Sequence, residues 1–514
     1  MNKGLLLAIV GSVFLLAPCV WSQQPNSCAD LSSFKAPGVE ITKTAAVPAG
    51  STTPIPYTTP PKSLVLPAYC RVEGVINRRT GVGGEEFGIH FALAMPDAWN
   101  GDFLMQGGGG GNGIVFEPIG QTGAGDKPAL MRGYAVLSTD TGHKSHNGVF
   151  DFSFQRDQQA ALDFAYEANP ESASLAKQII AAHYGKPAGY SYFTGCSTGG
   201  REGMVLSQRY PTEFDGIIVG DPAMRTGFSN LAIGEWIPVA FNQIAPKDSN
   251  GKPIITQAIT DDDRKLVMDA LMKQCDAQDG LADGLISDPL ACHFDPESLA
   301  CKPGQTASCL APEKAAAIKK ALDGPETSHG VQVYPGFLYD SDIAATAGIR
   351  GILVPGPGIF GPPPTATEID VDSQALKATQ LLVDSTDTNL STFAAHGGKL
   401  IFYHGDSDPW FSPLDTFNYY KAMAAANGGL ESVEKWSQFY FVAGMSHCAG
   451  GRSLDQFDLL GALSNWVEKG IAPESVTATG NAFPGRSRPL CPYPKHAQYK
   501  GQGNTEDAAN FECR

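Results

Sequence analysis

A serine lies among small residues in the stretch GCSTGG, Gly195 to Gly200. The stretch has the pattern Gly-x-Ser-x-Gly. The residues before it, YSYFTG, have the composition of a strand, and those after it, REGMVLSQRYP, have the apolar spacing of a helix. A sharp turn between a strand and a helix raises a serine hydroxyl above a sheet, where it can attack a substrate. Ser197 is therefore the candidate nucleophile, although a serine that only caps the following helix would give the same pattern.

A serine hydroxyl attacks well only when an imidazole takes its proton and a carboxylate orients that imidazole. His447 follows the strand-like segment QFYFVAGMS, and Asp408 comes just after KLIFYHG. Both residues stand where a predicted strand ends, and the order serine, aspartate, histidine is that of the α/β-hydrolase fold. We therefore predict that Ser197, Asp408 and His447 form a catalytic triad.

Two other aspartates, Asp406 and Asp415, lie close to Asp408 in the sequence, and capping of a helix start would explain any of the three. Asp408 is favoured chiefly by the family resemblance described below. His404 precedes all of them, so it does not compete with His447 for the role of base. It is interpreted as a hydrogen-bonded histidine of the core.

Acyl transfer also needs hydrogen-bond donors aimed at the developing oxyanion. The glycine-rich run from Gln106 to Gly113, QGGGGGNG, follows a predicted strand, which is where lipases and esterases carry such a loop. One donor would be the backbone N–H of Gly108 or Gly109, and the other that of Thr198. The run also fits the dinucleotide pattern Gly-x-Gly-x-x-Gly, but no following helix or ribose-binding acid accompanies it, so we expect no organic cofactor.

The amino terminus, MNKGLLLAIVGSVFLLAPCVWSQQ, has one lysine, an apolar run and then small or polar residues. This is typical of a secretory signal peptide, and we place its cleavage after Ser22. The alternative is a lipoprotein anchored through Cys19, although a proline directly before that cysteine departs from the usual pattern. The chain is thus expected to be secreted or periplasmic. No later segment is apolar over a length that spans a bilayer.

Cleavage would leave ten cysteines, an even number that in an exported chain predicts disulfides rather than metal thiolates. None of them shows Cys-x-x-Cys spacing. The ten are Cys28, Cys70, Cys196, Cys275, Cys292, Cys301, Cys309, Cys448, Cys491 and Cys513. Their spacing suggests three local bridges: Cys275–Cys292, Cys301–Cys309 and Cys491–Cys513.

Cys196 directly precedes the candidate nucleophile, and Cys448 directly follows the candidate base. A bridge between them would hold Ser197 and His447 within hydrogen-bonding reach. Closing so long a loop would also stabilise the fold by about 5 kcal/mol in the chain-entropy model. The alternative is a pair of buried free thiols.

The segment CDAQDGLADGLISDP carries aspartates at short intervals among glycines. Asp276, Asp279 and Asp283 could supply carboxylates to a hard cation, and Leu281 and Leu285 could supply backbone carbonyls. The spacing differs from that of an EF-hand. We expect a structural calcium site here, and the alternative is a solvated acidic loop.

The elements that must position these residues alternate between strand and helix, which predicts an α/β fold with a mostly parallel sheet. The alternation lapses between about residues 224 and 386, a stretch with four cysteines and a proline-rich run, which we interpret as an inserted lid domain. The net charge of −16, with no basic cluster, argues against a nucleic acid partner. The predicted organisation is a signal peptide (1–22), a first core part (23–223), the lid with its calcium site (224–386) and a second core part (387–514).

These motifs resemble the tannase and fungal-type feruloyl esterase family, which also includes the enzyme that hydrolyses mono(2-hydroxyethyl) terephthalate. The resemblance rests on GCSTGGREG, HGDSDPWF, SHC and CDAQDGLADGL, and it covers nearly all of the mature chain. It implies an α/β-hydrolase core, a lid, a calcium site on the residues named above, and substrates that are esters of aromatic acids. It also places Trp410 and Phe411 against the aromatic ring, although ordinary packing would explain both. Thr198 follows the tannase and feruloyl esterase pattern.

The leading hypothesis is an exported serine esterase that acts on small phenolic acid esters, such as ferulates or gallates, through an acyl-enzyme on Ser197. The membrane is not an expected partner. One alternative is a terephthalate half-ester hydrolase, for which Arg350 would be a candidate carboxylate-binding residue. Another is a catalytically inactive, calcium-stabilised binding protein on the same scaffold.

Overall fold

The computed structural model of the chain describes residues 26–54, 63–355, 364–379 and 382–514. The expected signal peptide, residues 1–22, lies outside the described residues. Among the helices of the described part, none is long and apolar enough to cross a membrane.

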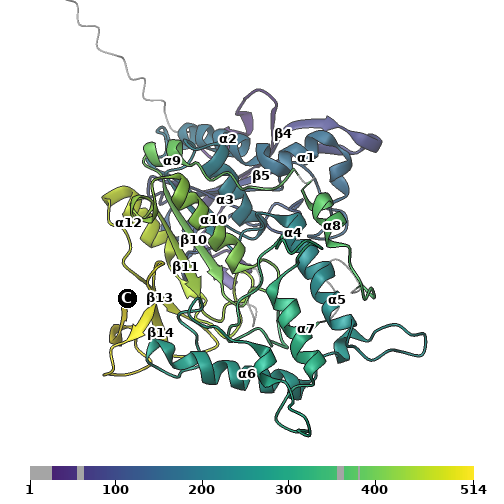
Figure 1. Cartoon of the computed structure of the whole chain (residues 1–514). Coiled ribbons are helices and arrows are strands. Elements are labelled where there is room, and N and C mark those ends of the chain that lie inside the picture. The colour runs from purple at the N-terminus through teal and green to yellow at the C-terminus, as the bar shows by residue number, and fades with distance from the viewer. Residues whose placement is uncertain (1–25, 55–62, 356–363, 380–381) are drawn as a thin grey trace, which may run out of the picture.

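A twisted nine-stranded sheet forms the centre of the molecule (Figure 1). The strands from β7 to β11 pair in parallel, whereas β1, β4 and β5 extend the sheet in antiparallel order. The sheet is therefore mixed, with a parallel half where the α/β alternation was predicted. In spatial order the strands are β1 (Val39–Val47), β4 (Tyr69–Thr80), β5 (Glu86–Pro96), β7 (Ala135–Thr139), β6 (Phe103–Gln106), β8 (Ser191–Cys196), β9 (Gly216–Gly220), β10 (Lys399–Gly405) and β11 (Ser437–Val442).

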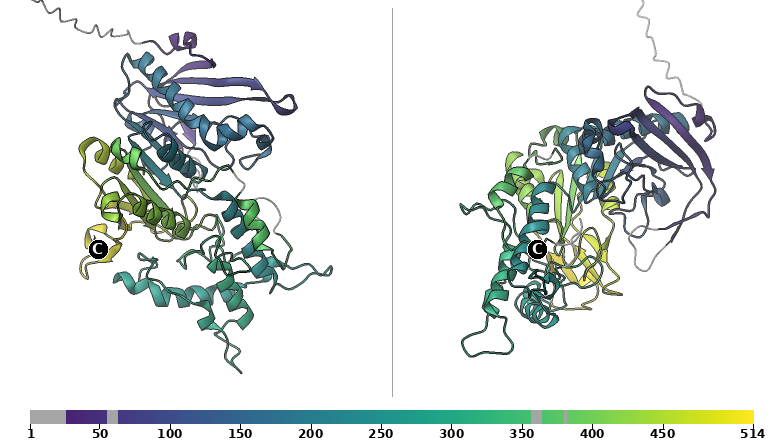
Figure 2. Two further views of the ribbon diagram at one scale, coloured as in Figure 1. Left: turned by 45° about the horizontal axis from the view of Figure 1, so that its top comes forward. Right: turned by 90° about the vertical axis from the view of Figure 1, so that its right-hand side faces the viewer.

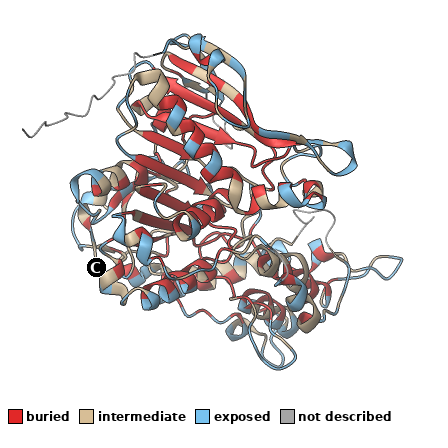
Figure 3. Ribbon diagram, turned by 90° about the horizontal axis from the view of Figure 1, so that it is seen from above, coloured by how far each residue is buried: buried red, intermediate tan, exposed pale blue. Residues whose placement is uncertain are grey.

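Helices cover both faces of the sheet, and its central strands are buried between them, whereas the edge strand β1 has no buried residue (Figure 3). Side chains alternate along each strand, so Phe193 and Phe402 face one apolar cluster while Tyr192 and Tyr403 face the other. The first cluster includes residues of α2 (Ala168–Tyr184), α3 (Thr198–Arg209) and α10 (Pro413–Ala426), and the second includes α12 (Leu459–Lys469). The helix predicted after Ser197 is α3, and Gly185, in the left-handed conformation, caps the carboxyl end of α2.

The described residues between β9 and β10 form helices but no strand, and we call residues 224–386 the insert. The insert has an apolar core of its own, in which Phe241, Leu271 and Ile318 are fully buried. In Figures 1 and 2, α5 to α7 lie on the side of the molecule opposite β1, β4 and β5. The helices of the insert are α4 (Thr226–Leu231), α5 (Ile237–Asn242), α6 (Asp261–Cys275), α7 (Pro312–Asp323) and α8 (Val371–Ala378).

Smaller elements complete the chain. Helix α12 starts at Leu459, where the side chain of Asp458 accepts the N–H of Gly461 at 2.8 Å and caps the helix. The remaining helices and strands are α1 (Gln158–Leu162), α9 (Ser391–Ala395), α11 (Leu430–Val433), β2 (Thr52–Pro54), β3 (Ser63–Val65), β12 (Gln456–Phe457), β13 (Val476–Thr479), β14 (Ser487–Leu490), β15 (Ala497–Tyr499) and β16 (Phe511–Cys513).

All ten cysteines named above form disulfides in the structure. The three local bridges suggested by the sequence are present, and Cys28 pairs with Cys70. The bridges are Cys28–Cys70, Cys196–Cys448, Cys275–Cys292, Cys301–Cys309 and Cys491–Cys513.

Candidate active site

Ser197 occupies the turn that leads from β8 into α3. Its φ of 64° and ψ of −123° are strained for a residue other than glycine. The glycines on either side permit so tight a turn, because a Cβ at Gly195 would lie only 2.4 Å from Gly199 O. The turn presents Ser197, which is partly exposed, at the carboxyl edge of the parallel strands.

The glycine-rich loop after β6 lies beside this turn, and its two candidate donors are not equivalent. The N–H of Gly108 donates to Glu202 Oε2 at 3.1 Å, whereas the N–H of Gly109 donates to no acceptor within the described part of the chain. Thr198 is the first residue of α3, so its N–H has no partner inside the helix. Its hydroxyl donates to Gly110 O and ties the helix to the loop. The geometry therefore favours Gly109 over Gly108 as the oxyanion donor from this loop, with Thr198 as the second donor.

Glu202 is an anchor of this loop that the sequence analysis missed. Its side chain is 1% exposed, and Oε1 accepts from Asn112 Nδ2 at 2.5 Å while Oε2 holds Gly108. Burial raises the pKa of Glu202, and the neighbouring Arg201 and these donors oppose that rise. The adjacent charges of Arg201 and Glu202, in a helix otherwise rich in glycine and apolar residues, were the available signal.

Asp408 and His447 meet at the ends of β10 and β11. His447 Nδ1 lies 2.7 Å from Asp408 Oδ2, and both side chains are buried. The other oxygen, Oδ1, accepts the N–H of Trp410 at 2.8 Å and that of Phe411 at 3.2 Å. Burial alone would raise the pKa of Asp408, but the imidazoles of His447 and His404 bring it below its usual value. The carboxylate is thus ionised and held against the candidate base.

The two rival acids occupy different environments. Asp406 is 2% exposed, and neither of its carboxylate oxygens has a hydrogen-bond partner among the described residues. Burial, with Asp340 nearby, raises the pKa of Asp406 well above its usual value. Asp415 instead accepts from Arg225 Nε at 3.0 Å. Of the three aspartates, Asp408 is the one that the geometry joins to His447.

The Cys196–Cys448 disulfide brings the two halves of the site together. It links positions 252 residues apart in sequence and sets their Cα atoms 5.9 Å apart. His447 Nε2, the nitrogen that Asp408 leaves free, lies 3.6 Å from Cys448 Sγ and so faces the bridge. In the described residues the Ser197 hydroxyl and His447 form no hydrogen bond, and such bonds commonly shorten only when substrate binds.

Aromatic rings surround the imidazole. The ring of Trp410 lies 4.6 Å from that of His447, and the ring of Phe411 lies 5.3 Å from it, both measured between centroids. Phe150, from the segment before α1, packs edge-on against Trp410 at 6.3 Å. Both Trp410 and Phe411 are partly exposed, so each has ring surface beside the candidate base. Arg350, by contrast, is exposed on the insert.

The insert contributes a buried support that the sequence analysis did not foresee. Asp340 Oδ2 accepts from Ser407 Oγ at 2.7 Å and from the N–H of Gly444 at 2.8 Å. Ser407 directly precedes Asp408, and Gly444 lies in the loop that leads to His447. A single carboxylate from the insert therefore ties together the two loops that carry the candidate acid and base.

The acidic loop lies outside this site and follows α6. Asp276 Oδ1 accepts the N–H of Asp283 and of Gly284, each at 3.0 Å. Asp283 also pairs with Arg488. Burial, with Asp283 and Asp276 nearby, raises the pKa of Asp279 to about 6.

The loop offers the all-oxygen donor set that calcium takes, with its crowded carboxylates and the carbonyls of Leu281 and Leu285. Within the described residues, the oxygens of Asp276, Asp279 and Asp283 do not all converge within 4.8 Å, as those of a preformed cluster would. The oxygen donors of this loop therefore suit calcium chemically, and a bound cation would have to draw the three carboxylates together.

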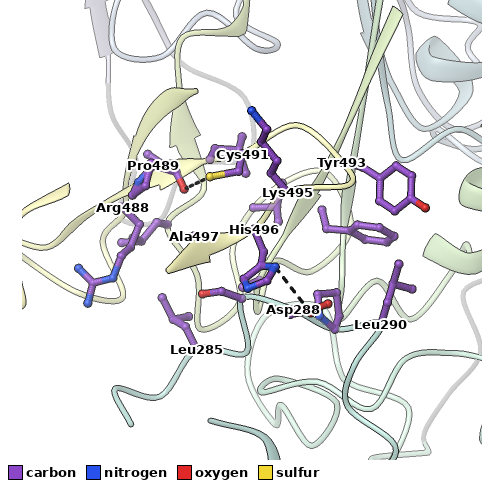
Figure 4. A pocket seen from close by; sticks show the side chains of 18 of the residues that line it. Leu285, Asp288, Leu290, Arg488, Pro489, Cys491, Tyr493, Lys495, His496 and Ala497 are labelled. Atoms are coloured by element: carbon purple, nitrogen blue, oxygen red, sulfur yellow. Dashed lines mark hydrogen bonds and ion pairs between the residues drawn. The ribbon is translucent and has the colours of Figure 1, made fainter. Parts of the chain in front are cut away.

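A separate cavity lies between the end of this loop, β11 and the carboxy-terminal segment (Figure 4). Leu285 and Leu290 contribute apolar walls, and His496 Nδ1 lies 3.6 Å from Asp288 Oδ2. None of the three candidate triad residues lines it. This cavity is therefore distinct from the catalytic arrangement.

Comparison with known proteins identifies the family. The family model described as "Tannase and feruloyl esterase" matches residues 70–355 and 364–514. The chain belongs to the tannase and feruloyl esterase family. Mono(2-hydroxyethyl) terephthalate hydrolase of Piscinibacter sakaiensis is 36% identical over 523 residues, covering 87% of this chain and 85% of that protein. The probable feruloyl esterase B-2 of Neosartorya fischeri is 28% identical over 544 residues, covering 97% and 98%.

Solved structures of this family have the same fold. Feruloyl esterase B from Aspergillus oryzae has a TM-score of 0.75 at 25% identity, covering 95% of this chain and 99% of that one. Tannin acyl hydrolase from Aspergillus niger has a TM-score of 0.70 at 22% identity, covering 96% and 93%. The chain is thus an ester hydrolase of this family by sequence, and its α/β fold is that of the feruloyl esterases and tannases.

Proposed function

We propose that this chain is an exported serine esterase that hydrolyses esters of aromatic acids, with Ser197 as nucleophile, His447 as base and Asp408 as the acid that orients it. The observation that carries the proposal is the Cys196–Cys448 bridge. The bridge joins the strained turn that carries Ser197 to the residue directly after His447. The imidazole of His447 is in turn hydrogen-bonded to the buried carboxylate of Asp408. The five disulfides of the structure support export, because such bridges persist in oxidising compartments.

In the proposed mechanism, His447 Nε2 takes the proton of the Ser197 hydroxyl while Oγ attacks the ester carbonyl. The N–H groups of Gly109 and Thr198 stabilise the oxyanion of the tetrahedral intermediate. His447 then gives its proton to the departing alcohol and leaves an acyl group on Ser197. Water, activated by the same imidazole, releases the acid. Throughout, Asp408 keeps the hydrogen of His447 on Nδ1.

The acid part of the substrate would lie against Trp410 and Phe411, whose rings flank His447. We assign the insert the role of a lid over this position. We also assign a structural calcium ion to the acidic loop, where it would neutralise crowded carboxylates. Its proposed ligands are Asp276, Asp279, Leu281, Asp283 and Leu285.

Phenolic acid esters, such as ferulates and gallates, are the favoured substrates, because the solved relatives are named feruloyl esterase B and tannin acyl hydrolase. A terephthalate half-ester is the second candidate, favoured by the 36% identity to an enzyme named for it. An inactive binding protein on this scaffold is the contrasting hypothesis.

Rates on methyl ferulate, methyl gallate and mono(2-hydroxyethyl) terephthalate, measured with purified protein, test the proposal. We expect turnover of at least one of the two phenolic esters, and none with the Ser197→Ala variant under the same conditions. Faster turnover of the terephthalate ester would favour the second candidate. Failure to hydrolyse these esters and p-nitrophenyl acetate would favour the binding protein.

A further inference from the structure

A second imidazole lies directly behind the candidate catalytic acid. His404, on β10, is fully buried, and its Nδ1 is 3.0 Å from Thr416 Oγ1, as a core histidine would require. Its Nε2, however, faces three acceptors at once. It lies 3.0 Å from Phe411 O, 3.3 Å from Asp408 Oδ2 and 3.6 Å from Asp221 Oδ1. Because the carbonyl oxygen of Phe411 and the ionised carboxylate of Asp408 can only accept, Nε2 carries a hydrogen.

Asp221 completes this group from the neighbouring strand. It follows β9 and is fully buried. Its Oδ1 accepts the N–H of Gly405 at 2.9 Å, and its Oδ2 lies 3.4 Å from the sulfur of Cys196. Oxygen and nitrogen atoms of Asp221, His404 and Asp408 all lie within 4.8 Å of one another. The disulfide, the catalytic acid and this second pair therefore form one contiguous block.

The charges around His404 favour its protonated form. Burial disfavours a charged imidazole, but Asp221 and Asp408 raise the pKa of His404 above its usual value. Burial raises the pKa of Asp221, and His404 opposes that rise. Other titratable groups also interact with this cluster. They are His447, on the far side of Asp408, Asp415, which pairs with Arg225, and the buried Asp406, Tyr334 and Tyr403.

We infer that His404 and Asp221 form a second imidazole–carboxylate pair that positions Asp408 and sets the charge experienced by the catalytic base. Asp408 Oδ2 faces both His447 Nδ1 and His404 Nε2, so it cannot rotate away from the base without losing both contacts. A cationic His404 offsets one of the two carboxylate charges near His447. His404 and Asp221 are thus positioning residues, and the inference rests on the proposed triad.

The pH dependence of kcat/KM tests the pair through two substitutions of opposite sign. His404→Gln keeps an N–H donor for Asp408 but removes the positive charge, so His447 should hold its proton more tightly. The acid limb of the profile, which reports the base in the free enzyme, should move up by about one pH unit. Asp221→Asn removes a negative charge and should move the limb down. Thr416→Val changes an uncharged partner of His404 and should leave the limb in place.

A purely structural role would lower the rates of all three variants without opposite shifts, and that result would overturn the inference. An independent measurement uses ¹⁵N-histidine NMR on the Ser197→Ala variant, in which the buried cluster is intact. We expect one imidazole with both nitrogens protonated at neutral pH, perturbed by Thr416→Val. A neutral His404 would overturn the inference even if other variants fail to fold. Esterase activity retained by Ser197→Ala would instead overturn the triad, so the two failures are distinguishable.

Discussion

The candidate catalytic loops and the acidic loop are both carboxylate-bearing turns next to a disulfide, yet they obtain their order in different ways. Asp408 takes its imidazole partners from β10 and from the loop after β11, and the Cys196–Cys448 bridge closes 252 residues. In the acidic loop, Asp276 accepts N–H groups from within the same loop, and the adjacent Cys275–Cys292 bridge spans 17 residues.

This difference predicts different consequences of substitution. The catalytic loops are attached to the ends of buried parallel strands, so their geometry is set before substrate arrives, which is what electrostatic catalysis requires. The acidic loop holds its carboxylates with its own backbone N–H groups and with Arg488, and the proposed calcium ion would relieve their remaining repulsion. Changes in the first region should therefore appear in kcat, and changes in the second should appear in stability.

Ser197→Ala should have the largest effect. Removing a partly exposed hydroxyl leaves the fold intact but deletes the nucleophile, so kcat should fall by about a million-fold. Rates on a phenolic ester, together with an unchanged thermal unfolding midpoint, would check this. Activity above a trace would mean that the nucleophile is another residue, and the loops around Ser197 would then not be the catalytic region.

Asp408→Asn should lower kcat by about 10⁴-fold, because an amide beside Nδ1 favours the wrong tautomer of His447. Asp406→Asn is the matched control two residues away, and its kcat should fall less than about tenfold, because Asp406 makes no hydrogen bond to the base. The reverse ranking of the two variants would transfer the role of the acid to Asp406.

Replacing both Cys196 and Cys448 by serine should lower kcat by about a hundredfold, because a small displacement of His447 relative to Ser197 disrupts the attack geometry. Circular dichroism at 25 °C should remain near that of the parent, because the strand pairing, the apolar core and four other disulfides still hold the sheet. The Cys301→Ser and Cys309→Ser double variant is the control, with little expected change in kcat. Peptide mapping without reduction must show the Cys196–Cys448 crosslink, and finding either cysteine free would contradict the argument.

Calcium should act on stability rather than on rate. At a concentration a hundred times its Kd, calcium should raise the free energy of unfolding of chelator-treated protein by about 2.7 kcal/mol. Asp279→Asn should abolish that increase, whereas Asp262→Asn, an exposed change on α6 outside the loop, should retain it. Denaturant titrations with and without calcium measure the effect. A large loss in kcat with an unchanged free energy of unfolding would contradict a purely structural role for the acidic loop.

The last prediction concerns Asp406, whose carboxylate has no hydrogen-bond partner among the described residues. Its pKa in the folded state is raised above the ordinary value of 3.8 by burial, so its ionisation costs stability once the pH exceeds that value. Relative to the parent, Asp406→Asn should therefore gain up to about 1.4 kcal/mol for each pH unit between 3.8 and the folded-state pKa. Unfolding titrations at pH 4, 6 and 8 would show the gain. A difference independent of pH would mean that Asp406 is not a strained buried acid.

Local patterns predicted a large part of this protein. The alternation of strands and helices predicted the parallel half of the sheet, and residue spacing predicted three of the disulfides. The positions of Cys196 and Cys448, beside the candidate nucleophile and base, predicted a fourth. The turn around Ser197 was recognisable because Gly-x-Ser-x-Gly between a strand and a helix is a local signal. The spacing of its aspartates indicated the acidic loop, and the family resemblance favoured Asp408 over the two aspartates near it.

The tertiary structure distinguished candidates that the sequence left equivalent. Gly108 and Gly109 are chemically equivalent as donors. They differ in the structure because Glu202, on α3, accepts the N–H of Gly108. His404 was expected to be an ordinary core histidine, but the pairing of β10 with β9 sets it between Asp221 and Asp408. Sequence periodicity determines which face of an element is buried. Which buried polar groups then meet depends on strand order and register, because residues hundreds of positions apart come together only when the sheet has formed.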